Sequence, residues 1–499
     1  MASPINSYLY RKRVTFMSLS FIDYAMIVLY FILTIGAGVV GSRFAKTRED
    51  YLVAGRRLSF PLFFGCMGAV ALGGASTIGS TRLGYEYGFG GIWLNVSIGL
   101  GLICAGLLIT SKLSKLRAIS VNEVVERSYG RAAHTFSTVL TLIYTLVLSV
   151  TQVIAIGSIV NGALGLDVTV SMLLGGGIVI AYTFIGGMWS VTMTDIVQFV
   201  YQTIGVIILA PICCLCAAGG WDALVSKVPE TYLSVTNMGF DRSFSYILLY
   251  VPGLIIGQDI WQRIFTAKNE KISKRGTIAA GFYSILYAFA TVIIGMSVFA
   301  LLPELSNPQD AFSVGVVSFL PSGIRGIVLA AAMAATMSVV SGTILASSTV
   351  MYNDLYLRLV PSKPEPNREV HVTRCIAGII GVIVMVCALL IEDLLAGIDI
   401  CYGYLSGCVF VPLVASFILK RFSPKAGLVS LAASSIAVTV CFVVFGTSSS
   451  IPIIAGMAAG VIGYGITTAI DPQRKDSPFA EIDALDETAE TGVKDEQQE

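Results

Sequence analysis

Long apolar segments alternate with short polar ones along almost the whole chain. With about 20 apolar residues for one membrane crossing, the pattern predicts about thirteen helices. They are expected at residues 21–41, 60–81, 90–111, 133–162, 167–187, 195–218, 243–264, 275–302, 315–352, 372–391, 399–420, 425–445 and 449–469. The pattern therefore predicts an all-α polytopic membrane protein.

The composition indicates the same class. Of 499 residues, 55% are hydrophobic and 13% charged, and the mean hydropathy is +0.80, whereas soluble domains average about 25% charged residues. A net charge of +1 without a basic cluster argues against a nucleic-acid partner. His134 and His371 are the only histidines and are expected in polar loops. The chain therefore offers few histidines for a zinc site or a Ser-His-Asp triad. We predict no enzymatic activity and no organic cofactor.

Lysine and arginine concentrate in four connecting segments. These are SRFAKTREDYLVAGRR, SKLSKLRAISVNEVVERSYGR, RIFTAKNEKISKR and KRFSPKAG. With thirteen spans all four fall on one side, which the positive-inside rule makes cytoplasmic. This predicts a multi-pass protein of the plasma (inner) membrane with its amino terminus outside and its carboxyl terminus in the cytoplasm.

The predicted spans divide the chain into seven parts. Residues 1–20 are expected to be an N-terminal extension, either dispensable or a start-site artefact before Met17, because Arg11 to Arg13 are unfavourable outside the cell. The other parts are an extra first helix with a cytoplasmic loop (21–58), a first core repeat (59–218), an extracytoplasmic loop (219–242), a second core repeat (243–422), two C-terminal helices (423–470) and a disordered acidic tail (471–499).

Two of the predicted helices carry residues that interrupt a helix. Gly73 and Gly74 are adjacent in the second span, and each weakens a helix by about 1 kcal/mol relative to alanine. Pro252 and Gly257 interrupt the seventh span. Interrupted helices in corresponding positions of two halves flank the binding site in transporters with inverted repeats. We therefore expect a shared site at the membrane midplane, with close helix packing as the alternative for the glycine pair.

Charged residues near the predicted spans need partners. Asp195 begins the sixth span and must find a partner unless it caps that helix. Asp259 and Arg263, four residues apart, are expected to form a structural pair near the cytoplasmic surface. Arg82 and Glu86 have the same spacing at the outer end of the second span, where they either gate entry or only neutralise each other.

Hydroxyl groups are concentrated in the ninth span, in the stretch TMSVVSGT. Ser338 and Ser341 are three residues apart and share one helix face with Ala335. Oxygen ligands on one face suit a small hard cation such as Na⁺. Alternatively, each serine bonds a carbonyl one turn back or a neighbouring helix.

Several segments resemble the sodium/solute symporter family, which includes bacterial proline, pantothenate, sialic acid and galactose symporters and animal glucose and choline transporters. These segments are DYLVAGRRL, YTFIGGMWSVTMTDIVQ, QDIWQRIFTAKN, AAMAATMSVVSG and SSTVMYNDLY. The resemblance extends from Asp23 to Phe422. It implies a five-plus-five inverted-repeat core and cation-coupled symport of a small organic solute.

The resemblance also implies one Na⁺ site near the first interrupted helix. Its ligands would be the main-chain carbonyls of Ala69, Leu72 and Ala335 and the hydroxyl of Ser338. Val339 stands where the family usually supplies a second hydroxyl. This site would therefore lack one side-chain oxygen.

Some members of the family have a second Na⁺ site. The matching residues are Asp195, Ser338 and Ser341, and Gly342 replaces a further serine. Na⁺ is the expected coupling ion, with a proton carried by Asp195 as the alternative.

The resemblance places a substrate pocket around seven residues. These are Ala71, Gly73, Ser76, Asn95, Gln152, Tyr250 and Tyr404. Such a pocket would offer amide and hydroxyl groups and no fixed charge. Choline-type relatives enclose a quaternary ammonium with tryptophans that this chain lacks at the matching positions. An amino acid or carboxylate is therefore the predicted solute, while a sugar or polyol stays open.

Two functions other than symport are compatible with these patterns. One is a membrane-embedded solute sensor and the other is a passive channel. For symport, the expected partners are a small organic solute, Na⁺ or H⁺, and the lipid bilayer. No obligatory protein partner is implied.

Overall fold

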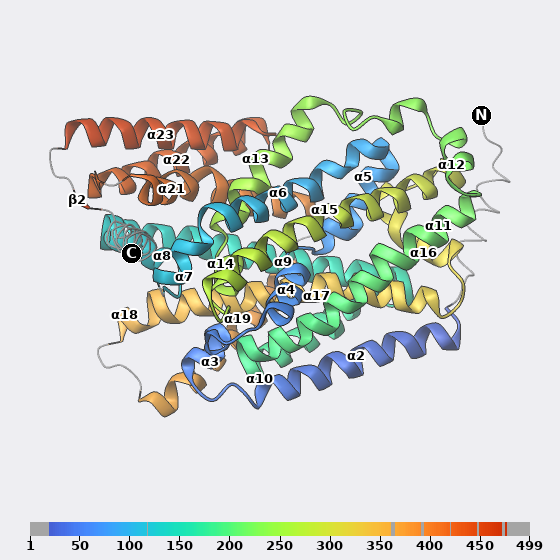
Figure 1. The fold of residues 1–499 in the computed structure, drawn as a ribbon, viewed down its shortest axis with the longest axis horizontal. Coiled ribbons are helices and arrows are strands. Elements are labelled where there is room, and N and C mark those ends of the chain that lie inside the picture. The colour runs from blue at the N-terminus through green and yellow to red at the C-terminus, as the bar shows by residue number, and fades with distance from the viewer. Residues whose placement is uncertain are drawn as a thin grey trace, which may run out of the picture.

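The structure is a computed structural model that describes residues 19–116, 118–360, 365–390, 394–419, 421–446, 449–471 and 475–476. Helices form nearly all of this part of the chain (Figure 1), which confirms the all-α class. Almost all of the predicted N-terminal extension and acidic tail lies outside the described residues.

The helices of the first half begin with an extra helix before the interrupted one. They are α2 (Phe21–Ser42), α3 (Arg48–Val53), η1 (Ala54–Arg56), α4 (Phe60–Val70), η2 (Ala75–Gly79), α5 (Ser80–Tyr87), η3 (Gly88–Ile92), α6 (Trp93–Leu108), α7 (Thr110–Leu116), α8 (Val121–Tyr129), α9 (Arg131–Leu164), α10 (Val168–Gln202), η4 (Thr203–Leu209), α11 (Ala210–Ala218), α12 (Trp221–Lys227) and η5 (Glu230–Leu233).

The second half again contains an interrupted helix. Its elements are α13 (Phe240–Ile256), α14 (Gln258–Ile264), α15 (Glu270–Leu301), η6 (Pro308–Asp310), α16 (Ala311–Phe319), α17 (Ile324–Val350), η7 (Met351–Tyr356), α18 (Leu357–Leu359), α19 (Pro366–Ala388), α20 (Leu394–Tyr404), η8 (Leu405–Val409), α21 (Phe410–Ile418), α22 (Pro424–Phe445) and α23 (Ile451–Ile470). Two short strands, β1 (Arg421–Phe422) and β2 (Lys475–Asp476), pair antiparallel.

Ten helical runs in the described residues are long and apolar enough to cross a membrane, and the bent pair α13–α14 makes eleven. The predicted count of thirteen is not confirmed. One difference is the run Val168–Ala218, which has 51 residues; at 1.5 Å per residue it measures about 75 Å, more than twice a bilayer core. Gly187 interrupts this run with φ 54° and ψ −140°. The other difference from the predicted spans is α4, because its 11 residues are too few to cross a membrane alone.

Both predicted interruptions are present, although Pro252 lies within α13 and only Gly257 marks the second break. After α4 the chain leaves the helix and resumes at the π-helical turn η2, and α13 and α14 meet at Gly257 with a bend of 44°. Gly73 and Gly74 allow close approach of other helices: an added Cβ would lie 2.5 Å from Gln152 Oε1 at Gly73 and 2.5 Å from Ala155 Cβ at Gly74. The first interruption therefore packs directly on α9.

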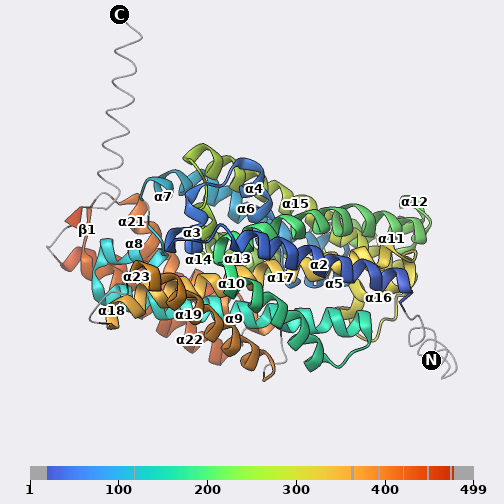
Figure 2. The ribbon, with the colours of Figure 1, turned by 90° about the horizontal axis from the view of Figure 1, so that it is seen from below.

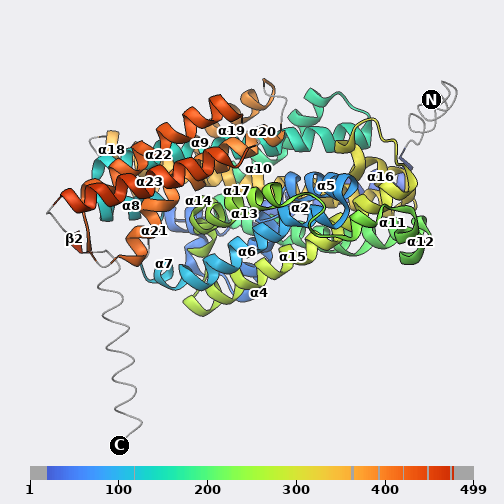
Figure 3. The same ribbon diagram turned by 90° about the horizontal axis from the view of Figure 1, so that it is seen from above.

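The interior of the bundle is built around α17. In the most apolar stretch of that helix 94% of residues are buried, against 22% in α22 and in α23. Figure 1 shows α2 on one side of the bundle and α22 and α23 on the opposite side, and Figures 2 and 3 show the same bundle from below and above. The outer helices present apolar side chains such as Phe21, Val443 and Ile470 outward, as lipid-facing helices do. Functional groups on α17 therefore lie inside protein.

Candidate functional site

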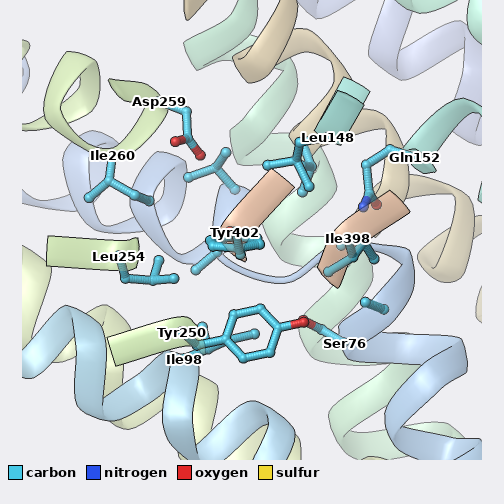
Figure 4. A pocket seen from close by; sticks show the side chains of 15 residues that line it. Ser76, Ile98, Leu148, Gln152, Tyr250, Leu254, Asp259, Ile260, Ile398 and Tyr402 are labelled. Carbon is cyan, nitrogen blue, oxygen red and sulfur yellow. The ribbon is translucent and has the colours of Figure 1, made fainter. Parts of the chain in front are cut away.

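A pocket lies between the two interrupted helices (Figure 4). Its lining includes residues that flank each interruption, together with side chains of α6, α9, α17 and α20. The lining residues are Val70, Ala71, Gly73, Ala75, Ser76, Ile98, Leu148, Gln152, Tyr250, Leu254, Asp259, Ile260, Val339, Ile398 and Tyr402. The chain segments that sequence reasoning singled out for their breaks thus meet at one cavity.

Five of the seven predicted substrate residues line this pocket. These are Ala71, Gly73, Ser76, Gln152 and Tyr250. The Gln152 Oε1 atom also accepts the Gly74 main-chain N–H at 2.7 Å. The amide side chain therefore ties α9 to the first interruption.

The other two predicted substrate residues lie elsewhere. Asn95 is buried and donates to the Ser76 main-chain carbonyl at 2.9 Å, which fixes the backbone behind the pocket. The Tyr404 hydroxyl shares a hydrogen bond of 2.8 Å with Thr439 of α22. Tyr402 faces the pocket instead, because residues two apart on a helix lie about 200° apart around its axis.

The hydroxyl groups of α17 have defined partners. Ser338 Oγ donates to Asp195 Oδ1 at 2.7 Å, and Ser341 Oγ donates to the Ser338 main-chain carbonyl at 2.9 Å. Ala335 is buried on the same helix, and Ala69 and Leu72 are buried at the end of α4, which packs against α17. Ser341 thus follows the back-bonding alternative, while Ser338 connects α17 to α10.

Asp195 is the centre of a buried cluster of four helices. Its carboxylate accepts Ser338 Oγ, Cys66 Sγ at 2.9 Å and Arg263 Nη2 at 3.2 Å. The expected pair of Asp259 and Arg263 is therefore not what forms. Arg263 contacts Asp259 through the main-chain carbonyl, at 3.4 Å from Nη1, and its charge is paired with Asp195 on α10.

The guanidinium of Arg263 also explains the glycine at position 342. A Cβ on Gly342 would lie 2.7 Å from Nη2 and 2.8 Å from Nη1 of Arg263. The place where the resemblance puts a further serine is therefore next to a fixed positive charge. Sequence reasoning missed this contact because Arg263 and Gly342 are distant in the chain.

Asp259 is the second buried carboxylate of this region. Its side chain lines the pocket, and Oδ1 accepts the Tyr144 hydroxyl at 2.8 Å. Gly257 makes room for this arrangement, since a Cβ there would lie 3.0 Å from Asp259 Oδ1 and 3.3 Å from the Tyr144 hydroxyl. The pocket therefore contains a carboxyl group in addition to the expected amide and hydroxyl groups.

Two other features singled out in the sequence lie away from the pocket. The predicted pair Arg82–Glu86 is present, at 2.9 Å, and Arg82 also donates to Gln309 of η6 at 3.2 Å. The expectation that His134 lies in a polar loop is wrong. It is buried in the first turn of α9, with Nε2 3.4 Å from Asp354 Oδ1.

Comparisons with known proteins give one consistent result. A sequence model of the sodium:solute symporter family matches residues 51–433. The chain is 24% identical to the sodium/glucose cotransporter of Vibrio parahaemolyticus, over 83% of this chain and 84% of that one. It is 23% identical to the sodium/pantothenate symporter of Escherichia coli (81% and 86%) and 25% identical to the high-affinity proline transporter PutP of Bacillus subtilis (75% and 82%).

Solved structures share the fold. A Na⁺-coupled sialic acid symporter, in a substrate-bound outward-open state, superposes with a TM-score of 0.79 at 21% identity, over 92% of this chain and 99% of that one. A nucleobase-cation-symport-1 family transporter in a closed conformation gives a TM-score of 0.56 at 15% identity, over 86% and 96%.

Proposed function

The chain belongs to the sodium:solute symporter family, and from this premise we propose secondary active symport of a small organic solute with Na⁺ by alternating access. The protein is a multi-pass membrane transporter, not an enzyme, and Na⁺ is its coupling ion. The observation that carries the mechanism is the pocket between the two interruptions, since transporters with interrupted helices bind solute there.

The coupling cation is assigned to the end of α4 and the middle of α17. The ligands would be the carbonyls of Ala69, Leu72 and Ala335 and the hydroxyl of Ser338, which together give oxygen ligands suited to Na⁺. One cation crossing about 100 mV releases about 2.3 kcal/mol, and a tenfold concentration gradient adds about 1.4 kcal/mol. A single Na⁺ therefore supports solute accumulation of several hundredfold.

The substitution Ser338→Ala is expected to raise the Na⁺ concentration for half-maximal uptake about tenfold, equivalent to about 1.4 kcal/mol, because it removes one ligand. Na⁺ titration of uptake into proteoliposomes would measure this. The matched control is Ser348→Ala, since Ser348 lies on the same helix and bonds only its own turn in the structure, at 2.6 Å from the Ile344 carbonyl. Equal Na⁺ dependence of the two variants would remove Ser338 from the site.

Val339→Ser is expected to lower the half-maximal Na⁺ concentration severalfold, because it restores the hydroxyl that this site lacks. Val339 lines the pocket close to Gly73, so the smaller serine fits the available space. Val339→Ala is the control, with similar volume and no hydroxyl. If serine and alanine shift the Na⁺ titration equally, the hydroxyl does not bind the cation.

We assign a different role to Asp195. Its ion pair with Arg263 supplies the carboxylate with a permanent positive neighbour, so the Arg263 guanidinium would take the place of a second cation. Ser341 would then be structural. One Na⁺ per transport cycle, measured from the reversal potential of solute-driven currents, is the expected stoichiometry; two would contradict this role for Arg263.

Uptake assays would test the function as a whole. Purified protein in liposomes should accumulate labelled solutes against a gradient when Na⁺ is supplied outside, and should not do so in Na⁺-free buffer. A solute sensor would bind without uptake, a passive channel would equilibrate without accumulation, and a proton-coupled symporter would respond to a pH gradient instead.

We propose a plasma-membrane protein with the basic segments on the cytoplasmic side. Supporting this, Figure 1 places α3, α7 and α8 toward one end of the bundle and α11 and α12 at the other. The amino terminus would then lie outside and the carboxyl terminus inside. The half-buried pair of Arg82 and Glu86 would stabilise the external entrance, where Arg82 also donates to Gln309 of η6.

A further inference from the structure

One lining residue of the pocket, Asp259, is acidic, and its side chain forms no ion pair within the described residues. Asp259 is 3% exposed and its carboxylate is directed toward the pocket (Figure 4). Neutral groups donate the hydrogen bonds to this carboxylate: the Tyr144 hydroxyl at 2.8 Å and main-chain N–H groups in the first turn of α14. A neutral donor orients the carboxylate and leaves its negative charge in place.

The nearest basic side chain is engaged elsewhere. Arg263 forms its ion pair with Asp195 at 3.2 Å and reaches Asp259 only at the main-chain carbonyl. Within the described residues, the carboxylates of Asp195 and Asp259 therefore share one neighbouring guanidinium, that of Arg263. Arg263 also acts on Asp259 at longer range, but one guanidinium balances the charge of one carboxylate, and a cationic solute in the pocket would balance the charge of the other.

A row of three tyrosine rings begins at this carboxylate with Tyr144 and continues along the pocket through Tyr402 to Tyr250. Tyr250 and Tyr402 line the pocket and pack edge to face, with ring centroids 5.0 Å apart, and Tyr144 packs in the same way on Tyr402 at 5.3 Å. Tyrosine rings attract ammonium groups through their faces. A carboxylate with neighbouring tyrosines is a suitable environment for a protonated amine or a quaternary ammonium, and it disfavours a solute whose only charge is a carboxylate.

We propose that the transported solute carries a cationic amino or ammonium group and that Asp259 binds this group, with Tyr402 lying between Asp259 and Tyr250 along the pocket (Figure 4). This inference rests on the proposed symport, because it assigns the chemistry of the same pocket. Gln152 and Ser76, which also line the pocket, provide polar groups for the rest of the solute. Amino acids and amino alcohols fit this description, whereas simple carboxylates, sugars and polyols do not.

The test uses the full-length protein in nanodiscs and matched pairs of solutes that differ in the cationic group. The pairs are L-alanine with L-lactate, L-proline with tetrahydrofuran-2-carboxylate, and choline with 3,3-dimethylbutan-1-ol. Thermal unfolding in the presence of Na⁺ reports binding, since a ligand of the folded state raises the melting temperature. We expect stabilisation by at least one cationic member and by no amine-free member.

Variants of Asp259 make the assignment specific. Asp259→Asn keeps the shape and the bond to Tyr144, and it should weaken solute binding at least tenfold while stabilisation by Na⁺ alone persists. Asp259→Glu should restore part of the affinity. Asp222→Asn, at an exposed position on α12, is the control and should change neither response.

Each contrary outcome has a definite meaning. The inference would be overturned if amine-free solutes raised the melting temperature, or if no solute of the panel did so. It would also be overturned if the cationic solutes stabilised the wild type and Asp259→Asn equally. Loss of the Na⁺ response in Asp259→Asn would make Asp259 a ligand of the coupling ion and overturn it as well. The proposed symport fails separately, if the wild-type protein shows no Na⁺-driven accumulation of any solute that it binds.

Discussion

Replacing Arg263 with glutamine is expected to abolish transport and to destabilise the protein by about 3–5 kcal/mol, because the substitution leaves the Asp195 carboxylate buried without a counter-charge. The side chains of Arg263 and Asp195 are 1% and 0% exposed, and the pair connects α14 to α10. Thermal unfolding in nanodiscs and Na⁺-driven uptake into proteoliposomes would measure the two effects.

A second substitution separates lost charge pairing from lost packing. Combining Arg263→Gln with Asp195→Asn removes both charges, and we expect it to recover about 2 kcal/mol or more of the stability lost in the single variant. Failure of this rescue would show that packing, and not charge, makes Arg263 necessary.

A surface pair provides the matched control. Arg358 donates to Glu126 at 2.7 Å, where its hydrogen bond lowers the pKa of Glu126. This pair is partly exposed, and pairs of this kind contribute about 1 kcal/mol or less. Arg358→Gln should therefore leave uptake and melting temperature nearly unchanged. If Arg358→Gln and Arg263→Gln lowered uptake and melting temperature equally, burial of the ion pair would not explain the effect of Arg263→Gln.

The interrupted helices could be predicted from the sequence because their causes are local. Adjacent glycines at 73 and 74, and a proline with a nearby glycine at 252 and 257, disfavour a continuous helix wherever the chain places them. Apolar length likewise predicts an all-α membrane protein without reference to tertiary contacts. The predicted span 167–187 ends at the turn that Gly187 makes, whereas the predicted count of thirteen is not confirmed at α4, because hydropathy alone does not show that this helix ends after 11 residues.

The charge pairing could not be predicted because it depends on tertiary contacts. Asp259 and Arg263 have the spacing of a helical pair, yet Arg263 pairs with a carboxylate 68 positions earlier in the chain. Tyr402 and Tyr404 illustrate the same limit, since two residues along one helix decide whether a ring faces the pocket or α22. Sequence position thus identified the right segments, whereas the side-chain partners required the fold.

Gly74→Ala is expected to reduce Na⁺-driven uptake at least tenfold, because the added methyl group forces the first interruption away from its neighbours. The new Cβ would lie 2.5 Å from Ala155 Cβ on α9 and 3.0 Å from Thr336 Cγ2 on α17. Overpacking of this kind costs about 1–3 kcal/mol. It would also strain the bond of 2.7 Å from the Gly74 N–H to Gln152, which holds the backbone beside the pocket.

Gly177→Ala is the matched control, because a Cβ at this position on α10 meets nothing within 4 Å. Alanine is favoured over glycine in a helix by about 1 kcal/mol, so this variant should be as stable as the wild type or more stable, with full uptake. Initial uptake rates and membrane-inserted amounts, compared for both variants, distinguish a damaged site from poor insertion. Normal uptake by Gly74→Ala would mean that the helices around the interruption separate readily, and that the close approach at Gly74 does not shape the pocket.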